Sequence, residues 1–160
     1  MAEILLVTGA IGKGKTTWCR ELVERLRKDG SQVCGVLSPA VFEDGQKVGI
    51  DMINLASGEQ RGFAVRRPQD SSALTKCWSM NEETIAWANH VLRQCAGCDC
   101  LIIDELGPVE FIQGQGLQEG MILLDSGQFS QAYVVVRPHL LPQAQARWPD
   151  ARVFNVEAKA

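Results

Sequence analysis

The stretch VTGAIGKGKTTWCRELVERL, from Val7 to Leu26, joins an apolar run to a segment with helical spacing through a glycine-rich octet. The octet Gly9–Thr16 reads GAIGKGKT and fits the pattern G-x-x-x-x-G-K-S/T, the P-loop or Walker A motif. The apolar run Ile4–Val7 predicts a buried strand, and the apolar spacing within Thr16–Lys28 predicts a helix that ends at Gly30. A P-loop in this setting predicts a binding site for a polyphosphate.

The composition of the octet has a physical reason. Glycines allow a loop whose backbone N–H groups point inward at phosphate oxygens, and the following helix adds its positive dipole end. Lys15 is expected to bridge the β- and γ-phosphates, the Thr16 hydroxyl to bind Mg²⁺, and Thr17 to donate on the α-phosphate side. At Lys13, a free position of the motif, a solvated lysine is the preferred alternative. The predicted nucleotide-binding residues are Gly9, Ala10, Ile11, Gly12, Lys13, Gly14, Lys15, Thr16 and Thr17.

A second motif, LIIDE at Leu101–Glu105, is an apolar strand-like run that ends in two acids. As a Walker B element it predicts that Asp104 joins Thr16 in holding Mg²⁺, through water. Glu105 is predicted to be the general base that orients and deprotonates an attacking water. Because parallel strands carry ligand sites at their carboxyl ends, both motifs are expected at one edge of a sheet. The alternative is that the two acids cap a helix or lie in solvent.

The rest of the chain alternates between strand and helix patterns. A turn signal at Glu43–Gln46 predicts a β-hairpin insertion at about residues 39–65, and Asn81 followed by two acids predicts a helix start. The alternation predicts an α/β fold of three layers with a mostly parallel sheet, and the length of 160 residues predicts one domain, 1–160. Further strands are expected at Gln32–Leu37, Gln60–Val65, Lys76–Met80, Cys100–Ile103, Ala132–Val136 and Val153–Val156, and a short helix at Leu117–Leu124.

Charge and hydropathy exclude several classes of function. The net charge of −3 argues against nucleic acid as a partner, because non-specific binding to it needs clustered Lys and Arg. No apolar stretch approaches the roughly 20 residues that cross a bilayer, so no membrane association is expected. The chain begins directly with an apolar run and lacks a leader pattern, which predicts a cytoplasmic protein.

Six cysteines occur, and in a cytoplasmic protein they are expected to be thiols. Cys95, Cys98 and Cys100 form a C-x-x-C-x-C run, for which a zinc or iron–sulfur site is one interpretation. No fourth ligand is near apart from His90. The preferred interpretation is a helix end followed by a buried strand, in which cysteine serves as a small apolar residue.

Four blocks in order from Gly9 to Val156 resemble the small P-loop nucleoside-triphosphatases of the thermophilic and cancer-related NTPase family: GAIGKGKTT, GVLSPAVFEDGQKVGIDMINLASGE, LIIDELGPVEF and VFNV. The resemblance implies a RecA-like core, Mg²⁺ dependence and hydrolysis of several nucleoside triphosphates. It carries the phosphate-binding positions onto Gly12 and Gly14 to Thr17, and the Walker B pair onto Asp104 and Glu105. The second acid of the family's motif falls on Glu110, either as support for the loop or metal shell or as a surface acid.

Arg137 follows the strand pattern Tyr133–Val136 and departs from the resemblance, since other members often carry a small polar residue there. An arginine at a strand end beside phosphates can stabilise transition-state charge in cis, so Arg137 is a predicted catalytic residue with Lys15 and Glu105. The alternative for Arg137 is a structural salt bridge.

Three functions compete at this point. The first is a hydrolase that transfers phosphate to water, with nucleoside triphosphates such as ATP or GTP as ligands. The second is a small nucleoside or metabolite kinase, for which Arg66–Arg67 would make a thin lid. The third is a nucleotide-switched binding module, whose hairpin would contact a protein partner. The sequence leaves the preferred base and the oligomeric state open.

Overall fold

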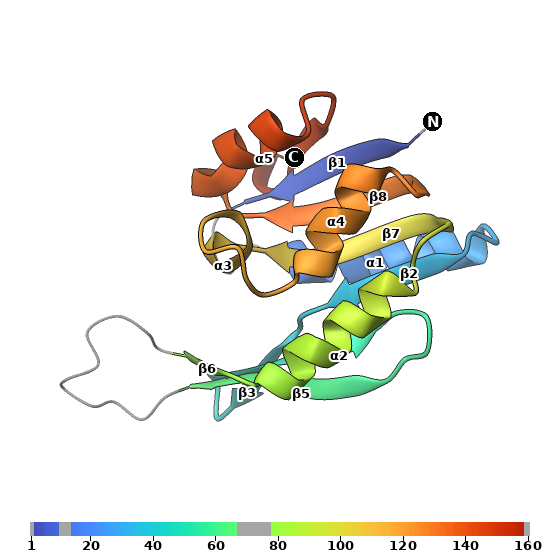
Figure 1. Cartoon of the computed structure of the whole chain (residues 1–160). Helices are drawn as coiled ribbons and strands as arrows, with labels where there is room; N and C mark the ends of the chain where they lie inside the picture. Colours follow the sequence, from blue (N-terminus) through green and yellow to red (C-terminus); the bar gives the residue numbers. More distant parts are fainter. Residues whose placement is uncertain (1, 10–13, 67–77, 159–160) are drawn as a thin grey trace.

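The computed structural model describes residues 2–9, 14–66 and 78–158, and one mixed sheet runs through them (Figure 1). Its strand order is β6-β5-β4-β2-β7-β8-β1-β9, and β3 pairs with β4. The parallel part contains β2 (Val33–Leu37), β7 (Cys98–Leu106), β8 (Phe129–Val136), β1 (Glu3–Thr8) and β9 (Arg152–Asn155).

Burial explains why these segments form the centre of the sheet. The runs Leu101–Ile103 and Val134–Val136 are completely buried, as expected for parallel strands that are covered on both faces. Strand β8 lies between β1 and β7, so the residues that follow these three strands come out at the same edge.

The predicted hairpin is part of a larger antiparallel extension. The extension consists of β3 (Ala40–Glu43), β4 (Gln46–Asn54), β5 (Gln60–Arg66) and β6 (Trp78–Met80). Its turn at Asp44–Gly45 has positive φ at both residues, as a two-residue hairpin requires. The hairpin is confirmed, but limiting the insertion to about 39–65 was wrong: β4 pairs with β2 and β6 pairs with β5, so the extension continues the main sheet.

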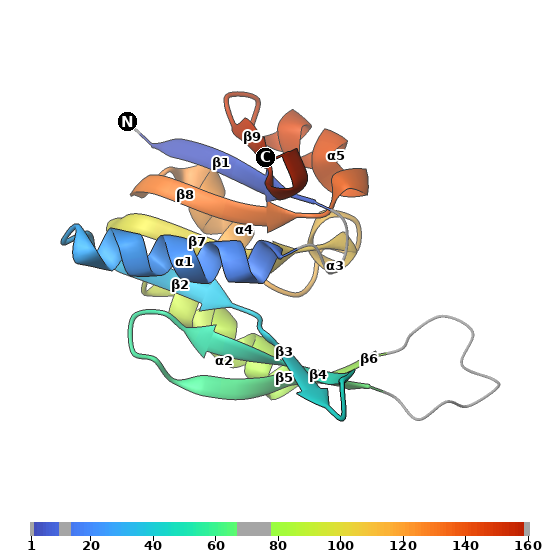
Figure 2. The same cartoon turned by 180° about the vertical axis from the view of Figure 1, so that it is seen from behind.

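Helices cover both faces, which confirms the three-layer α/β fold. Helix α1 (Lys15–Lys28) packs on one face, as Figure 2 shows. On the other face lie α2 (Glu82–Arg93), α4 (Gln118–Ser126) and α5 (Leu141–Arg147), seen in Figure 1. Among the described residues, no helix has the length and apolar character to span a membrane.

The sequence predicted the start of one helix correctly but missed several short helices. The side-chain oxygen of Asn81 accepts from the backbone N–H of Glu83 at 2.9 Å and of Thr84 at 3.2 Å, which confirms the predicted start of α2. The sequence did not predict the short α3 (Pro108–Phe111), α5 or the 3-10 turns η1 (Pro138–Leu140) and η2 (Val156–Ala158). One or two turns are too short to show helical periodicity.

The prediction that all six cysteines are thiols is wrong for two of them. Cys34 on β2 and Cys98 on β7 form a disulfide, and Cys77 lies outside the described residues. Cys98 packs with Cys95 in the core on one face of the sheet, whereas Cys100 packs on the other face. Within the described residues no group of ligands for a metal is assembled from the C-x-x-C-x-C run. The free thiols of the described residues are buried: Cys19, Cys95 and Cys100.

Candidate active site

The carboxyl ends of β1, β7 and β8 meet the first turn of α1 at one edge of the sheet. Gly14 precedes α1 with φ of 82°, a left-handed conformation that favours glycine. Gly9 follows β1, where a Cβ would lie 2.8 Å from Cγ2 of Val156, so a larger residue would clash. Predicted phosphate-binding residues 10–13 (Ala10, Ile11, Gly12 and Lys13) lie outside the described residues.

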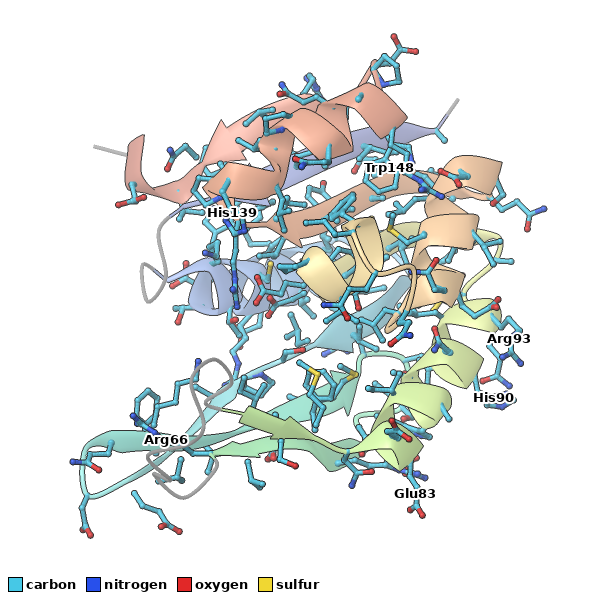
Figure 3. The ribbon with its side chains drawn as sticks, turned by 60° about the vertical axis from the view of Figure 1, so that its left-hand side comes forward. Arg66, Glu83, His90, Arg93, His139 and Trp148 are labelled. Atoms are coloured by element: carbon cyan, nitrogen blue, oxygen red, sulfur yellow. A yellow bond between two sulfur atoms is a disulfide. The ribbon has the colours of Figure 1, made fainter. Side chains whose placement is uncertain are left out.

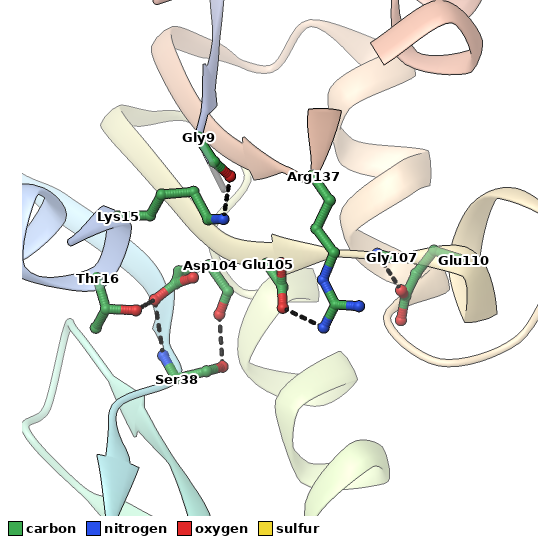
Figure 4. A network of polar contacts seen from close by, with 9 residues as sticks. All are labelled: Gly9, Lys15, Thr16, Ser38, Asp104, Glu105, Gly107, Glu110 and Arg137. Atoms are coloured by element: carbon green, nitrogen blue, oxygen red, sulfur yellow. Dashed lines mark hydrogen bonds and ion pairs between the residues drawn. The ribbon is translucent and has the colours of Figure 1, made fainter. Parts of the chain in front are cut away.

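The structure brings the two sequence motifs together. Thr16 Oγ1 donates a hydrogen bond to Asp104 Oδ2 at 2.7 Å, across 88 residues of chain (Figure 4). A hydroxyl has one proton and two lone pairs, so Thr16 keeps lone pairs for a cation while it donates to Asp104. This pair is the contact expected between a P-loop and its metal-handling strand.

Asp104 is a buried carboxyl group, and burial makes its ionisation unfavourable. It is 3% exposed, and loss of hydration raises its pKa to about 6. The hydrogen bond from Thr16 lowers the pKa, and the neighbouring Glu105 charge raises it. The hydrogen bond from Ser38 and the Lys15 charge also lower this pKa, and a divalent cation beside the carboxylate would lower it further.

Lys15 and Thr17 extend from the same helix start. Lys15 Nζ donates to the carbonyl oxygen of Gly9 at 2.6 Å, so the ammonium group links the start of α1 to the end of β1. Thr17 is exposed in the first turn of α1. Both residues therefore lie at the α1 start, where a phosphate chain would run.

Glu105 and Arg137 form an ion pair beside Asp104. Arg137, which directly follows β8, places Nη2 at 3.3 Å from Glu105 Oε1, with the two side chains 37% and 31% exposed. Glu105 Oε2 is buried and has no hydrogen-bond partner among the described residues. The β7 register shifts between Ile103 and Leu106, which allows both acids to face the site. The predicted catalytic residues Glu105 and Arg137 are thus neighbours.

Glu110 supports a loop, so the interpretation of Glu110 as a surface acid is wrong. Its Oε1 accepts from the backbone N–H of Gly107 at 2.8 Å, and its Oε2 accepts from that of Leu117 at 2.8 Å. Burial raises its pKa. The carboxylate joins the start of α3 to the start of α4 and so fixes the loop that follows the two acids.

Ser38, which sequence reasoning did not single out, contacts Asp104 twice. Its backbone N–H donates to Asp104 Oδ2 at 3.2 Å, and its hydroxyl donates to the Asp104 carbonyl oxygen at 2.5 Å (Figure 4). Ser38 directly follows β2, a parallel neighbour of β7. The rule that placed Thr16 and Asp104 at one sheet edge also applies to the residue after β2. The predicted strand Gln32–Leu37 ends directly before Ser38, so the sequence contained the signal for this residue.

The residues at this edge fit a magnesium ion. Mg²⁺ prefers oxygen ligands, and Thr16 and Asp104 supply a hydroxyl and a carboxylate next to each other. Two further oxygens nearby, Glu105 Oε2 and Thr8 Oγ1 at the end of β1, are buried without a hydrogen-bond partner among the described residues. Orphaned buried oxygens of this kind are expected where water or a cation completes the site.

Of the two arginines considered as a lid for a kinase, the structure describes only one. Arg66 is exposed at the end of β5 on the antiparallel extension (Figure 3), and Arg67 lies outside the described residues.

A mostly parallel sheet in which a glycine-led helix start faces two acids at the end of β7 defines a P-loop α/β protein. Comparison with protein families then places the chain within this class. The chain belongs to the NTPase family, whose profile matches residues 4–157.

Known proteins agree with this placement. The nucleoside-triphosphatase THEP1 of Ignicoccus hospitalis is 32% identical over 126 residues, which cover 77% of this chain and 69% of that protein. The solution structure of a human cancer-related nucleoside triphosphatase matches with a TM-score of 0.71 at 23% identity, covering 96% of this chain and 88% of that one. The crystal structure of THEP1 from the hyperthermophile Aquifex aeolicus matches with a TM-score of 0.70 at 22% identity, covering 98% and 90%. The two structures support the fold.

Proposed function

We propose that this chain is a Mg²⁺-dependent nucleoside triphosphatase that converts a nucleoside triphosphate and water to the diphosphate and phosphate. The hydrogen bond from Thr16 to Asp104 carries the proposal, because it joins the P-loop helix to the acidic strand end at the point where a cation would lie. Membership of the NTPase family supports hydrolysis, since the similar protein from Ignicoccus hospitalis is named for that activity.

The P-loop residues Gly9 to Thr17 would bind the triphosphate. Backbone N–H groups and the α1 dipole favour the anion, and Lys15 would exchange its contact with Gly9 for the β- and γ-phosphates. Thr16 and Asp104 would hold Mg²⁺, which when bound neutralises charge on the phosphate oxygens. Thr16 can keep its hydrogen bond to Asp104 in that state, because only its lone pairs are needed.

Glu105 is the proposed general base. Its carboxylate would accept a proton from water while the water oxygen forms a bond to the γ-phosphorus and the bond to the β-phosphate oxygen breaks. Arg137 holds Oε1 of Glu105, and Oε2 has no partner among the described residues, so Oε2 is the oxygen proposed to accept the proton. Arg137 would also lie close enough to stabilise charge on the transferred phosphoryl group.

The proposal has three further parts: base specificity, domain organisation and a protein partner. Broad base specificity is part of the proposal, and the phosphate-release panel below tests it. The continuous sheet and the family match over residues 4–157 support one P-loop NTPase domain in residues 1–160. A protein partner for the antiparallel extension stays a prediction.

The test is a phosphate-release panel over the common nucleoside triphosphates with Mg²⁺. Glu105→Gln should keep nucleotide binding and lower kcat by about 10²- to 10⁴-fold, because an amide cannot accept the proton. Lys15→Ala should lose both binding and turnover. Glu24→Gln, a change at an exposed position of α1, serves as the matched control and should behave as wild type.

Unchanged turnover in Glu105→Gln would exclude Glu105 as the base. If label from the γ-phosphate appeared only on an added nucleoside or metabolite, the chain would be a phosphotransferase. If hydrolysis were very slow and a protein were bound only in the triphosphate state, the chain would be a nucleotide-switched binding module.

A further inference from the structure

Ser38 occupies the joint between the parallel sheet and the antiparallel extension. Leu37 before it pairs with Ile53 on β4, and the carbonyl of Pro39 after it accepts from the backbone N–H of Asp51 at 2.9 Å. A residue that precedes proline is restricted to extended conformations. The backbone of Ser38 is therefore held on both sides before its own polar groups make any contact.

The backbone N–H and the hydroxyl of Ser38 both donate hydrogen bonds to Asp104. The backbone N–H shares Asp104 Oδ2 with the Thr16 hydroxyl, at 3.2 Å and 2.7 Å respectively. The Ser38 hydroxyl binds the carbonyl of Asp104, which belongs to the peptide unit that links Asp104 to Glu105. One residue thus fixes the carboxylate of Asp104 and the backbone that leads to the neighbouring acid.

Such a contact matters because Asp104 is nearly fully buried, so protein donors in place of water determine the orientation of its carboxylate. Burial opposes its ionisation, and donors from Thr16 and Ser38 offset part of that cost. Groups that orient a metal-binding carboxylate change metal affinity without touching the metal themselves.

We propose that Ser38 is a positioning residue for the divalent cation, acting through Asp104. The inference rests on the proposed function of the site, since it assumes that Asp104 and Thr16 hold Mg²⁺. The Ser38 backbone N–H holds the Asp104 carboxylate where it meets Thr16, the Ser38 hydroxyl holds the Asp104 carbonyl, and the pairings of Leu37 and Pro39 tie this segment to β4.

The experiment measures metal binding directly, with Mn²⁺ as a paramagnetic probe for the complex of the whole chain with ADP. Ser38→Ala removes the hydroxyl that holds the Asp104 carbonyl, and Ser38→Cys replaces it with a weak donor of similar size, while both variants keep the backbone N–H contact with Asp104 Oδ2. Both variants should bind Mn²⁺ about tenfold more weakly than wild type. Their affinity for ADP in EDTA should stay within about twofold of wild type, because the phosphate-binding loop is intact.

Ser57→Ala is the matched control, since it removes a serine hydroxyl from an exposed turn of the same extension, where Ser57 accepts from the N–H of Glu59. It should bind Mn²⁺ as wild type does. Wild-type Mn²⁺ affinity in either Ser38 variant would overturn the inference, as would an equal loss of ADP affinity in EDTA. If wild type binds Mn²⁺ with ADP but releases no phosphate from any triphosphate, the proposed function fails while the role of Ser38 is still measured.

Discussion

The side chain of Asp104 shows how one residue links metal binding to stability. It is 3% exposed, and its pKa rises from 3.8 to about 6, so the ionised form is unfavourable in the folded protein without a cation. A group whose folded pKa is raised contributes stability that is complete below the unfolded pKa and lost as pH rises through the folded pKa. Below both values Asp104 is neutral and its burial costs little.

Asp104→Asn is therefore expected to stabilise the metal-free protein at neutral pH. The free energy of unfolding of Asp104→Asn should equal that of wild type at about pH 4 and exceed it by about 1–3 kcal/mol at about pH 7.5. Urea unfolding in EDTA at both pH values measures the difference, with the exposed change Asp150→Asn as control. An equal pH dependence in wild type and Asp104→Asn would contradict the assignment. With Mg²⁺ and nucleotide, only wild type should gain stability from the metal.

At the scale of elements, the loop after β7 is organised by one carboxylate. Glu110 accepts from the backbone N–H groups of Gly107 and Leu117, which directly precede α3 and α4, and residues 112–117 between the two helices form no helix or strand. The short α3 has too few turns to be stable alone, so its position depends on this contact.

Glu110→Gln should lower the free energy of unfolding by about 1–3 kcal/mol. An amide can accept from one of the two backbone N–H groups but presents its own N–H₂ to the other, which leaves two part-buried donors facing each other. Chemical denaturation measures the change, and Glu43→Gln at the exposed hairpin turn should stay within about 0.5 kcal/mol. A Glu110→Gln variant as stable as wild type would show that the two contacts add nothing to folding.

At the scale of the whole molecule, the parallel sheet and the antiparallel extension share one core. Met52 on β4 is completely buried and packs in the cluster that also holds Val36 of β2 and Ala88 of α2. The extension therefore cannot lose its packing without exposing part of the core under the parallel strands.

Met52→Ala should lower the free energy of unfolding of the entire chain by about 2–5 kcal/mol in a single transition. Circular dichroism and tryptophan fluorescence should report the same midpoint. Met80→Ala on β6, where Met80 is 47% exposed, should change the free energy of unfolding by about 0.5 kcal/mol or less. Two separate transitions for Met52→Ala would mean that the extension unfolds independently, against the proposal of one domain.

The sequence by itself determined the α/β class, the P-loop in its strand-to-helix setting, the acids at the end of β7 and the start of α2 at Asn81. These features depend on neighbours within a few residues, so spacing and side-chain chemistry are enough to predict them. The rule that parallel strands carry ligand sites at their carboxyl ends then predicted that Thr16 and Asp104 lie close together, and the hydrogen bond between them confirms this.

Only the tertiary structure decided which residues contact the two acids and which cysteines pair with each other. The ion pair of Arg137 with Glu105, the contacts of Ser38 with Asp104 and the disulfide of Cys34 with Cys98 join residues 32, 66 and 64 positions apart. Such contacts depend on strand order and register, which the period of a strand does not encode. Glu110 illustrates the same limit, because a carboxylate becomes loop support only when folding buries it against two backbone donors.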